Sequence, residues 1–209
     1  MARRLQRLII LSVLALALPL AASAAASANT VTITPTGAKT LTATTGIKLV
    51  ITSTTRMTTT INCTGATIIA TLNSVSGSSW PLQISSDVRP AMTGCTLPGG
   101  VPVTIGCNPN GTWNVSGTTS GTTTPGRIGF NCSVRLTNSP TCNVNFLGSV
   151  AVTYDNATNQ LTVLTAGQML LAQNSTCTST FLNGTGMLTN PTGGAVIYTM
   201  TPATTISAV

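Results

Sequence analysis

Very few residues of this chain have side chains suited to acid–base, nucleophilic or metal chemistry. The sequence of 209 residues contains no histidine, and its only two acidic residues are Asp87 and Asp155. Histidine is the base or the ligand in a Ser-His-Asp triad, in a Cys-His pair and in a two-His metal centre, so the sequence excludes all three.

The two aspartates remain as candidates for catalysis, because a pair of carboxylates is what a glycoside hydrolase uses. Asp155 opens the sequence DNATN, and short polar side chains of this kind bond to their own backbone in turns. Asp87 precedes Arg89 and Pro90 in a predicted loop. We therefore expect structural roles for both aspartates.

Two lysines repeat a spacing known from nucleophile–lysine catalysis. Lys39 and Lys48 each follow a threonine by three residues. That spacing serves catalysis on a turn of a helix, whereas both segments here are predicted strands. We predict that the protein is not an enzyme and that it holds no metal ion and no cofactor.

Six cysteines are the other chemically distinctive residues. No CxxC spacing occurs and histidine is missing, which argues against a zinc site. In an exported chain these cysteines indicate disulfides, and six cysteines allow fifteen pairings. Their order favours local pairs, each stabilising the fold by about 3.5–4 kcal/mol on the chain-entropy account. The predicted pairs are Cys63 with Cys95, Cys107 with Cys132, and Cys142 with Cys177.

Residues 1–28 indicate export. Three arginines lie within the first seven residues, an apolar run covers 8–20, and the small-residue stretch AASAAASA follows. This order is typical of a secretory signal peptide, with cleavage after Ala24 or Ala28. The alternative is a retained membrane anchor, for which the apolar run is too short. We expect a secreted, extracellular or cell-surface protein with no transmembrane segment in the mature chain.

The charge of the chain points away from nucleic acid. The formal net charge is +7, and without the three arginines of the leader the remaining six Lys and Arg and two Asp give +4. These basic residues are scattered along the sequence, and few aromatic residues accompany them. A nucleic-acid-binding protein needs a basic stripe with stacking aromatics, so we predict no nucleic-acid partner.

The stretch between Cys142 and Cys177 shows the clearest strand pattern. Five apolar residues share one face: Val144, Phe146, Val150, Val152 and Tyr154. The opposite face is polar except for Leu147 and Ala151, and a period of two predicts a half-buried strand. After the DNATN turn the alternation resumes on a returning strand. The segment is therefore a predicted β-hairpin with a cysteine at each end.

The rest of the chain follows the same pattern. Roughly a fifth of the residues are threonine, and β-branched residues favour a pleated sheet. Turn residues recur every eight to twelve positions, as in antiparallel all-β folds. Predicted strands include 58–63 and 66–73, and the heptapeptide GQMLLAQ at 167–173 is the nearest helix candidate but is too short for one. We predict a disulfide-stapled antiparallel β-sandwich, Greek-key or jelly-roll-like.

Residues 29–209 form a single predicted domain. Residues 116–126 (SGTTSGTTTPG) are the most linker-like stretch of the chain. They either separate two packed halves or form a long hairpin loop, and the cysteines on both sides favour the loop.

The two tryptophans are the candidates for ligand binding. Trp80 and Trp113 both lie among small polar residues. An exposed tryptophan stacks on sugar rings or apolar ligands, whereas a buried one fills the core. The sequence favours the core for both and leaves ligand binding as the alternative.

The surface of the protein carries the functional hypotheses. Charged residues make up only 5% of the chain, and edge strands are normally protected by charged residues or proline. Residues 30–34 and 58–61 read as neutral, β-prone edges. The first hypothesis is a secreted structural or adhesive protein of the cell surface or matrix that self-associates by strand addition. The alternative is an extracellular module that binds a small ligand or a glycan.

Several segments resemble a family of small secreted bacterial proteins, the alkane oxidation protein activators, and uncharacterised actinobacterial relatives. The resemblance rests on the leader, Cys63, the segment SWPL at 79–82 and above all Cys142, VAVTYDNATNQL at 150–161, and Cys177. The pair Cys107 and Cys132 and the abundance of threonine depart from the family pattern. The resemblance implies an extracellular, non-enzymatic protein tied to surface behaviour or growth on hydrocarbons, and it transfers no site residues.

Overall fold

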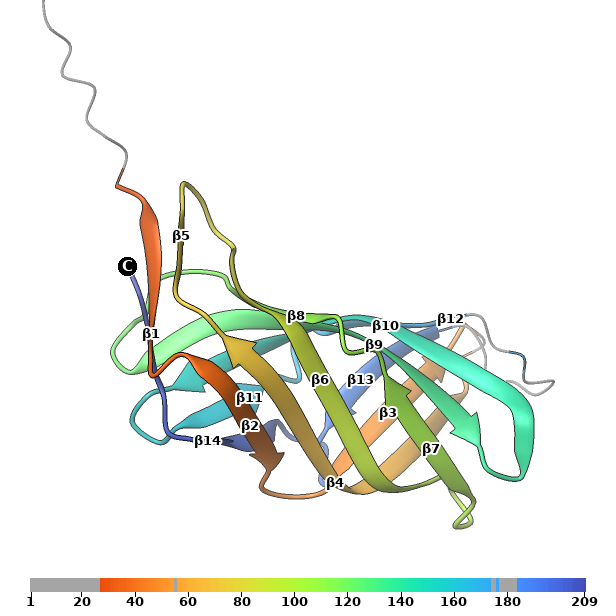
Figure 1. Cartoon of the computed structure of the whole chain (residues 1–209). Coiled ribbons are helices and arrows are strands. Elements are labelled where there is room, and N and C mark those ends of the chain that lie inside the picture. Colours follow the sequence, from red (N-terminus) through yellow and green to blue (C-terminus); the bar gives the residue numbers. More distant parts are fainter. Residues whose placement is uncertain (1–26, 55, 174–175, 177–183) are drawn as a thin grey trace, which may run out of the picture.

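The structure of the protein, a computed structural model, describes residues 27–54, 56–173, 176 and 184–209 (Figure 1). All regular elements of the described residues are strands, which confirms the all-β prediction. The strands are β1 (Asn29–Thr34), β2 (Gly37–Ala43), β3 (Ile47–Ser53), β4 (Thr58–Leu72), β5 (Val75–Gly77), β6 (Leu82–Thr96), β7 (Pro102–Cys107), β8 (Gly111–Val115), β9 (Thr123–Leu136), β10 (Ser139–Asp155), β11 (Gln160–Val163), β12 (Met169–Gln173), β13 (Gly184–Thr189), β14 (Val196–Thr201) and β15 (Thr205–Ala208).

Four long strands, β4, β6, β9 and β10, run through the whole length of the main sheet. They have 15, 15, 14 and 17 residues, whereas the other strands of that sheet have four to seven residues. At one end of the molecule the short strands β2, β8, β11 and β14 fill the spaces between the long ones. At the other end β3, β7, β12 and β13 do so.

These pairings close the main sheet on itself. One circuit runs β10–β11–β14–β2–β4–β6–β8–β9 and back to β10, and a second runs β10–β12–β13–β3–β4–β6–β7–β9 and back to β10. All of the pairs are antiparallel, as predicted. The predicted Greek-key or jelly-roll-like sandwich is not confirmed, because the main strands form one closed sheet. Its two walls face each other, with β4 and β6 in front of β3 and β13 in Figure 1.

A small three-stranded sheet, in the order β15-β1-β5, lies at one end of the main sheet (Figure 1). It pairs the first described strand with the last one, so that Val31 faces Ala208 and Thr34 faces Thr205. The first and last strands of the described chain are therefore held together by a backbone ladder.

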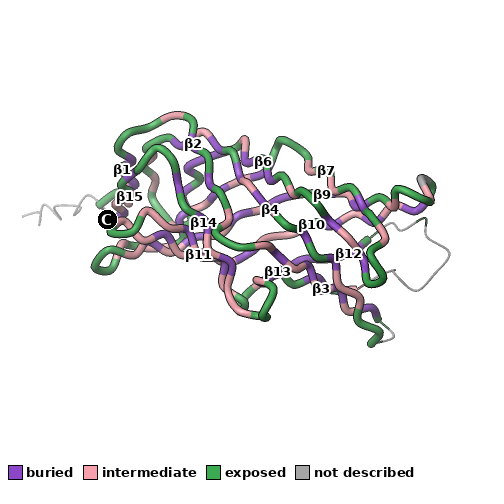
Figure 2. The backbone as a smooth tube through the Cα atoms, turned by 90° about the horizontal axis from the view of Figure 1, so that it is seen from below, coloured by how far each residue is buried: buried purple, intermediate pink, exposed green. Residues whose placement is uncertain are grey.

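The core lies between the two walls of the closed sheet. Inward-facing residues alternate with outward-facing ones along each strand, which Figure 2 shows as alternating buried and exposed segments of the tube. In β3, for example, Ile47, Leu49 and Ile51 are buried. An apolar cavity of about 10 Å³ beside Ile51 and Phe146 is at the lower limit for one water molecule. The described interior is packed with side chains and has no room for a ligand there.

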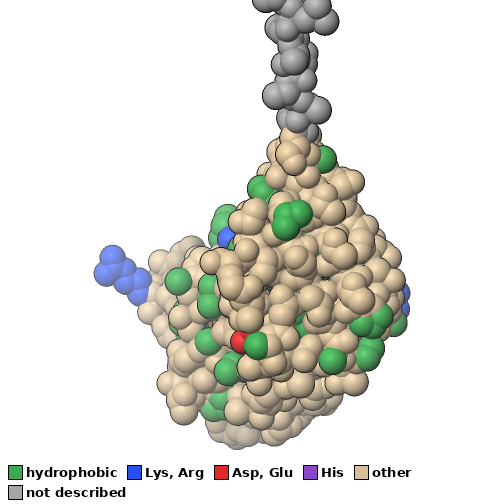
Figure 3. Space-filling model, turned by 90° about the vertical axis from the view of Figure 1, so that its left-hand side faces the viewer, with side chains coloured by type: hydrophobic (Ala, Val, Ile, Leu, Met, Phe, Trp, Pro, Cys, Tyr) green, Lys and Arg blue, Asp and Glu red, His purple; other side chains and the backbone are tan. Residues whose placement is uncertain are grey.

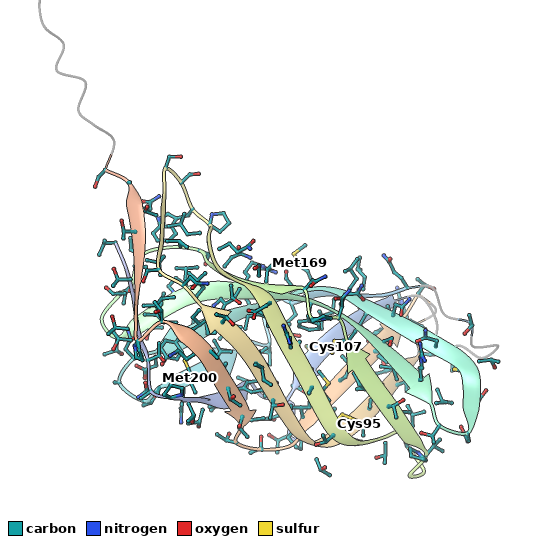
Figure 4. All side chains as sticks on the ribbon, viewed as in Figure 1. Cys95, Cys107, Met169 and Met200 are labelled. Atoms are coloured by element: carbon teal, nitrogen blue, oxygen red, sulfur yellow. A yellow bond between two sulfur atoms is a disulfide. The ribbon has the colours of Figure 1, made fainter. Side chains whose placement is uncertain are left out.

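Two of the three predicted disulfides are present. Cys63 in β4 bonds to Cys95 in β6, and Cys107 in β7 bonds to Cys132 in β9. In each pair the two cysteines lie directly opposite each other in the strand register; Cys95 and Cys107 are labelled in Figure 4. The third predicted partner, Cys177, lies outside the described residues.

The linker-like segment 116–126 joins two neighbouring strands. β8 ends at Val115 and β9 begins at Thr123, and these strands pair with each other through Val115 and Gly126. The segment therefore has the geometry of a hairpin loop. Among the described residues no helix is long and apolar enough to cross a membrane.

Candidate functional site

Asp87, the first candidate carboxylate, is bound to its own strand and to the neighbouring one. It accepts hydrogen bonds from the Thr71 N–H, the Thr71 hydroxyl and the Ser85 hydroxyl, each at 2.8 Å. The backbone hydrogen bond from Thr71 is the main cause that lowers the pKa of Asp87. The carboxylate fills a place at which the β6–β8 register is irregular, between Ser85 and Val88. The two hydrogen bonds from Thr71 join β4 and β6 at this point, and Asp87 lies within β6 and not in the loop that the sequence predicted.

Asp155, the second candidate, stabilises the hairpin turn between β10 and β11. It accepts hydrogen bonds from the Ala157 N–H at 2.9 Å and from the Thr158 hydroxyl at 3.1 Å. The bond from Ala157 is the main cause that lowers the pKa of Asp155. No group of three or more potential metal ligands occurs among the described residues.

The two lysines of the Thr-Gly-x-Lys segments lie on opposite sides of the sheet. Lys39 is on the inward face of β2, is only 2% exposed, and burial lowers the pKa of its ammonium group. Lys48 alternates with the buried Ile47 and Leu49 and faces outward from β3. Neither lysine lies on a helix, so the spacing does not bring a threonine hydroxyl to a lysine in the catalytic manner.

The tryptophans do not form an exposed ligand-binding pair. Trp113 in β8 is buried in the core and contacts Tyr154 edge-on, with ring centroids 6.4 Å apart and an interplanar angle of 71°. Its interior position corrects the ligand-binding alternative, because no ring face is presented to solvent. Trp80 is half-buried and packs against the core beside β6. The sequence-based preference for the core is therefore right for Trp113.

The strand edges that the sequence proposed for self-association are mostly paired. Residues 30–34 lie in β1, which has β15 on one side and β5 on the other. Residues 58–61 lie in β4 and pair with β3 on one side, while the β4–β6 pairing begins at Asn62. The closed sheet thus leaves only short stretches of edge in the described part of the chain, and long free edges for strand addition are not found there.

The outer edge of β15 is capped by side chains and by one loop. Ile206 donates its N–H to Asn156 Oδ1 at 2.8 Å and accepts a hydrogen bond from Asn156 Nδ2 at 2.9 Å. Ala208 donates to Thr119 Oγ1 at 2.8 Å and accepts from the Thr119 N–H at 2.8 Å. Two residues of this edge are therefore occupied and cannot pair with a further strand.

A cluster of exposed apolar side chains covers the outer face of β10, β12 and β13. Leu147 is 48% exposed, Met169 65%, Leu171 46% and Met187 38%. Leu147 is the register partner of Leu171. Met187 directly follows Gly186, which is the register partner of Leu170. We call these four residues the Leu/Met patch. In Figure 4, Met169 stands on the outer side of the upper wall.

The Leu/Met patch borders two adjoining hollows. The first, of about 480 Å³, is lined mainly by apolar side chains, namely Leu147, Met169, Leu170 and Leu171. The second, of about 340 Å³, is lined by the polar residues Asn108, Asn110, Thr112 and Asn131 together with Phe130 and Leu147. Both hollows share Leu147 and Gly148. A Cβ at Gly148 would lie 1.8 Å from the Met169 carbonyl oxygen, so only glycine permits this approach of β10 to β12.

Three cations lie on the two strands that flank the patch strands, two arginines on β9 next to β10 and one lysine on β3 next to β13. Arg127 in β9 donates hydrogen bonds to Ser149 Oγ at 3.0 and 3.2 Å and to the Gly167 carbonyl at 2.9 Å, at the edge of the apolar hollow. Arg135 lies further along β9 and is exposed. Lys48 lies on the outer face of β3, two residues from Val50, which is the register partner of Met187.

One signal for this surface is visible in the sequence. Leu147 interrupts the polar face of the predicted strand. The other members of the Leu/Met patch lie on β12 and β13, and the sequence did not predict that these segments are neighbours of β10. The heptapeptide GQMLLAQ is not helical: β12 covers Met169–Gln173 and alternates exposed with buried residues. If the heptapeptide is predicted to be a strand, its alternation places Met169 and Leu171 on one face.

Comparisons with protein-family models, with curated proteins and with solved structures found no match. The resemblance to the alkane oxidation protein activators therefore stays a prediction.

Proposed function

We propose that the protein is a secreted, non-enzymatic structural or adhesive protein of the cell surface or extracellular matrix, and that it works by contact through its outer side chains. The observation that carries this proposal is the Leu/Met patch. The leader-like segment 1–28 supports secretion, and the disulfides Cys63–Cys95 and Cys107–Cys132 suit an oxidising compartment.

The Leu/Met patch supports a contact role because its four apolar side chains are exposed and do not belong to the described core. Exposed apolar residues that cluster on one face mark interaction sites more often than isolated ones do. The described core is packed without these four side chains, which lie on the outer face of the sheet. On the face shown in Figure 3, by contrast, hydrophobic side chains are scattered over a largely polar, uncharged surface.

The proposed contact uses side chains and not strand addition. Strand addition needs a long row of unpaired backbone groups. In the described part of the chain the main sheet is closed, and the edge of β15 is capped by Asn156 and Thr119. Contact through an outer face needs no free edge.

The experiment is fractionation of a bacterial culture that expresses the full gene product with its own leader. We expect the protein in the cell-surface or matrix fraction, with the leader removed and no free thiol. Recovery of the protein from the cytoplasm, or entirely as a freely diffusing species in the cell-free medium, would refute the proposal.

A second candidate function is the binding of a neutral glycan or another small polar ligand. The amide-lined hollow supports it, because Asn108, Asn110 and Asn131 present neutral donors and acceptors around a space of about 340 Å³. A glycan array with the secreted protein tests it. Binding that is lost in Asn131→Ala but kept in Asn62→Ala, an exposed asparagine in β4, supports the second candidate; an array without signal rejects it.

A further inference from the structure

We propose that the face carrying the Leu/Met patch docks on an anionic lipid surface. In this arrangement the four apolar side chains enter the boundary between headgroups and acyl chains, and Lys48, Arg127 and Arg135 lie at the level of the headgroups. The inference rests on the proposed contact function and names the partner of that contact.

The centre of the docking face is apolar and offers no directional recognition. Leu147 and Leu171 are cross-strand partners, and Met169 and Met187 extend the apolar area toward β3. The backbone groups beneath them are engaged in the ladders between β10, β12 and β13. Long flexible apolar side chains over a paired backbone suit insertion among lipid acyl chains, which are fluid and apolar. A protein partner, by contrast, is normally held by hydrogen bonds at a polar rim.

The two arginines lie on either side of the patch along β9 and β10. Arg127 pairs with Ala151 and Arg135 pairs with Asn143, and each of those β10 residues is four positions from Leu147. At the rise of a strand this corresponds to about 13 Å in each direction. The arginines therefore lie on both sides of the apolar centre, and their long side chains can span part of the distance to it.

The lysine flanks the patch on the opposite side. Met187 pairs with Val50 in β3, and Lys48 is the next outward-facing residue along that strand. Cations around an apolar centre are the pattern of proteins that bind anionic membranes, where each basic residue near the surface contributes about 1 kcal/mol.

The acidic residues do not offset these cations. Asp87 is in β6, which does not contribute to the patch, and Asp155 is eight residues from Leu147 along β10. That is about 27 Å along a strand, far beyond the screening length of about 8 Å at physiological ionic strength. The charged residues named on the strands that flank the patch are thus all cationic, which favours an anionic partner. It disfavours a second copy of the chain, because two such faces would bring like charges together.

The test is binding of the secreted protein to large unilamellar vesicles, measured by co-sedimentation. One set of vesicles contains phosphatidylcholine alone, and the other contains equal parts of phosphatidylglycerol and phosphatidylcholine. We expect binding to the anionic vesicles that weakens as salt is added, and little binding to the neutral ones.

Variants locate the docking face. Met169→Ser together with Leu171→Ser should weaken binding by about tenfold, and Lys48→Gln by about fivefold. The matched controls are Ile69→Ser and Arg89→Gln, which should bind as the wild type does. Ile69 is 47% exposed and pairs with Arg89. It lies on β4, nine residues along the strand from Thr60, which is the partner of Val50. Thermal unfolding midpoints within a few degrees of the wild type verify that each variant is folded.

Three results would overturn the inference. The first is equal binding to neutral and anionic vesicles, and the second is unchanged binding by the Met169→Ser, Leu171→Ser double variant. The third is a dimer in sedimentation equilibrium that the same double variant dissociates, because the patch would then be covered by a second copy. If the protein stays on the cell surface in the fractionation experiment while vesicle binding fails, the lipid partner is wrong and the contact function stands.

Discussion

Replacing Tyr154 with phenylalanine tests how the end of the closed sheet is held to the small sheet. Tyr154 is buried at the end of β10 and donates its hydroxyl to the Thr204 carbonyl at 2.5 Å. The same hydroxyl lies 3.2 Å from Asn159 Oδ1, which accepts the Thr204 N–H at 3.0 Å. Asn159 has a φ of 54°, a left-handed conformation that asparagine tolerates. The three residues connect the β10–β11 turn to the segment that leads into β15.

The expected loss in Tyr154→Phe is about 2 kcal/mol of unfolding free energy. A net hydrogen bond contributes about 1 kcal/mol, and a buried carbonyl left without its donor adds about 1 kcal/mol or more. The aromatic ring stays in place against Trp113, so the packing term is unchanged. In a chain of this size 1 kcal/mol corresponds to about 2–4 °C, so the midpoint of thermal unfolding should fall by about 4–8 °C.

The matched control is Tyr198→Phe. Tyr198 is as deeply buried as Tyr154, on the inward face of β14, but its hydroxyl has no hydrogen-bond partner among the described residues. Removing that hydroxyl should change the unfolding free energy by about 0.5 kcal/mol or less, because no bond is lost. Both variants are compared with the wild type by differential scanning calorimetry at neutral pH. If the two variants lose the same stability, or if Tyr154→Phe loses nothing, the anchoring role of Tyr154 is refuted.

Three further outcomes follow from the same structure. Lys39→Met should raise the thermal midpoint by about 2–4 °C, because methionine fills the same inward space without the cost of a buried ammonium group; a lower midpoint would contradict this. Replacing Cys63 and Cys95 with alanine opens a loop with a sequence separation of 32 and should lower the midpoint by about 10 °C, from a loss of about 4 kcal/mol; an unchanged midpoint in calorimetry would contradict the structural role. Stability should be flat between about pH 5 and 8, since histidine is missing. The free energy of unfolding should fall above about pH 10, because burial raises the pKa of Tyr154 to about 12 and also raises that of Tyr198. The unfolded chain then releases these protons at a lower pH than the folded chain does. Denaturant titrations measure this dependence, and a decline in stability between about pH 5 and 8 would contradict the prediction.

Local features of the fold were predictable from the sequence. The alternation from Val144 to Tyr154 identified β10, and the DNATN turn is held by Asp155 as its residue types indicate. Two cysteine pairs follow from their order along the chain, because each pair closes a short loop between strands that are neighbours in the sheet. All of these depend on residues that are close in sequence.

Closure of the sheet was not predictable in the same way. It depends on pairs such as β11 with β14 and β3 with β13, which join segments far apart in the chain. The sequence also predicted two separate strands, 58–63 and 66–73, where the structure has β4, and Gly65 lies between the two predicted ranges. In the structure Gly65 lies within one continuous strand, where its Cβ would meet Thr93 Oγ1 at 2.9 Å. A glycine that admits a neighbouring strand and one that ends a strand look alike in sequence.

The Leu/Met patch was missed for the same reason. A side chain's face can be read from the alternation within one strand, but its neighbours depend on the register with the next strand. Leu147 was visible as an exception on a polar face, whereas Met169 and Leu171 lie in a heptapeptide to which the sequence assigned neither a strand nor a helix. Only the pairing of Leu147 with Leu171 joins them into one surface.

Closure also accounts for the low charge of the surface. A neutral, threonine-rich β protein with open edges would be prone to edge-to-edge aggregation, and such proteins place lysine, glutamate or proline along their edges as protection. Here the strands of the main sheet pair in closed circuits, and Asn156 and Thr119 occupy the edge of β15. With the backbone paired, the outer faces do not need charges to prevent association. The few cations that remain are therefore free to serve a contact, and three of them surround the one apolar patch on the outer face of β10, β12 and β13.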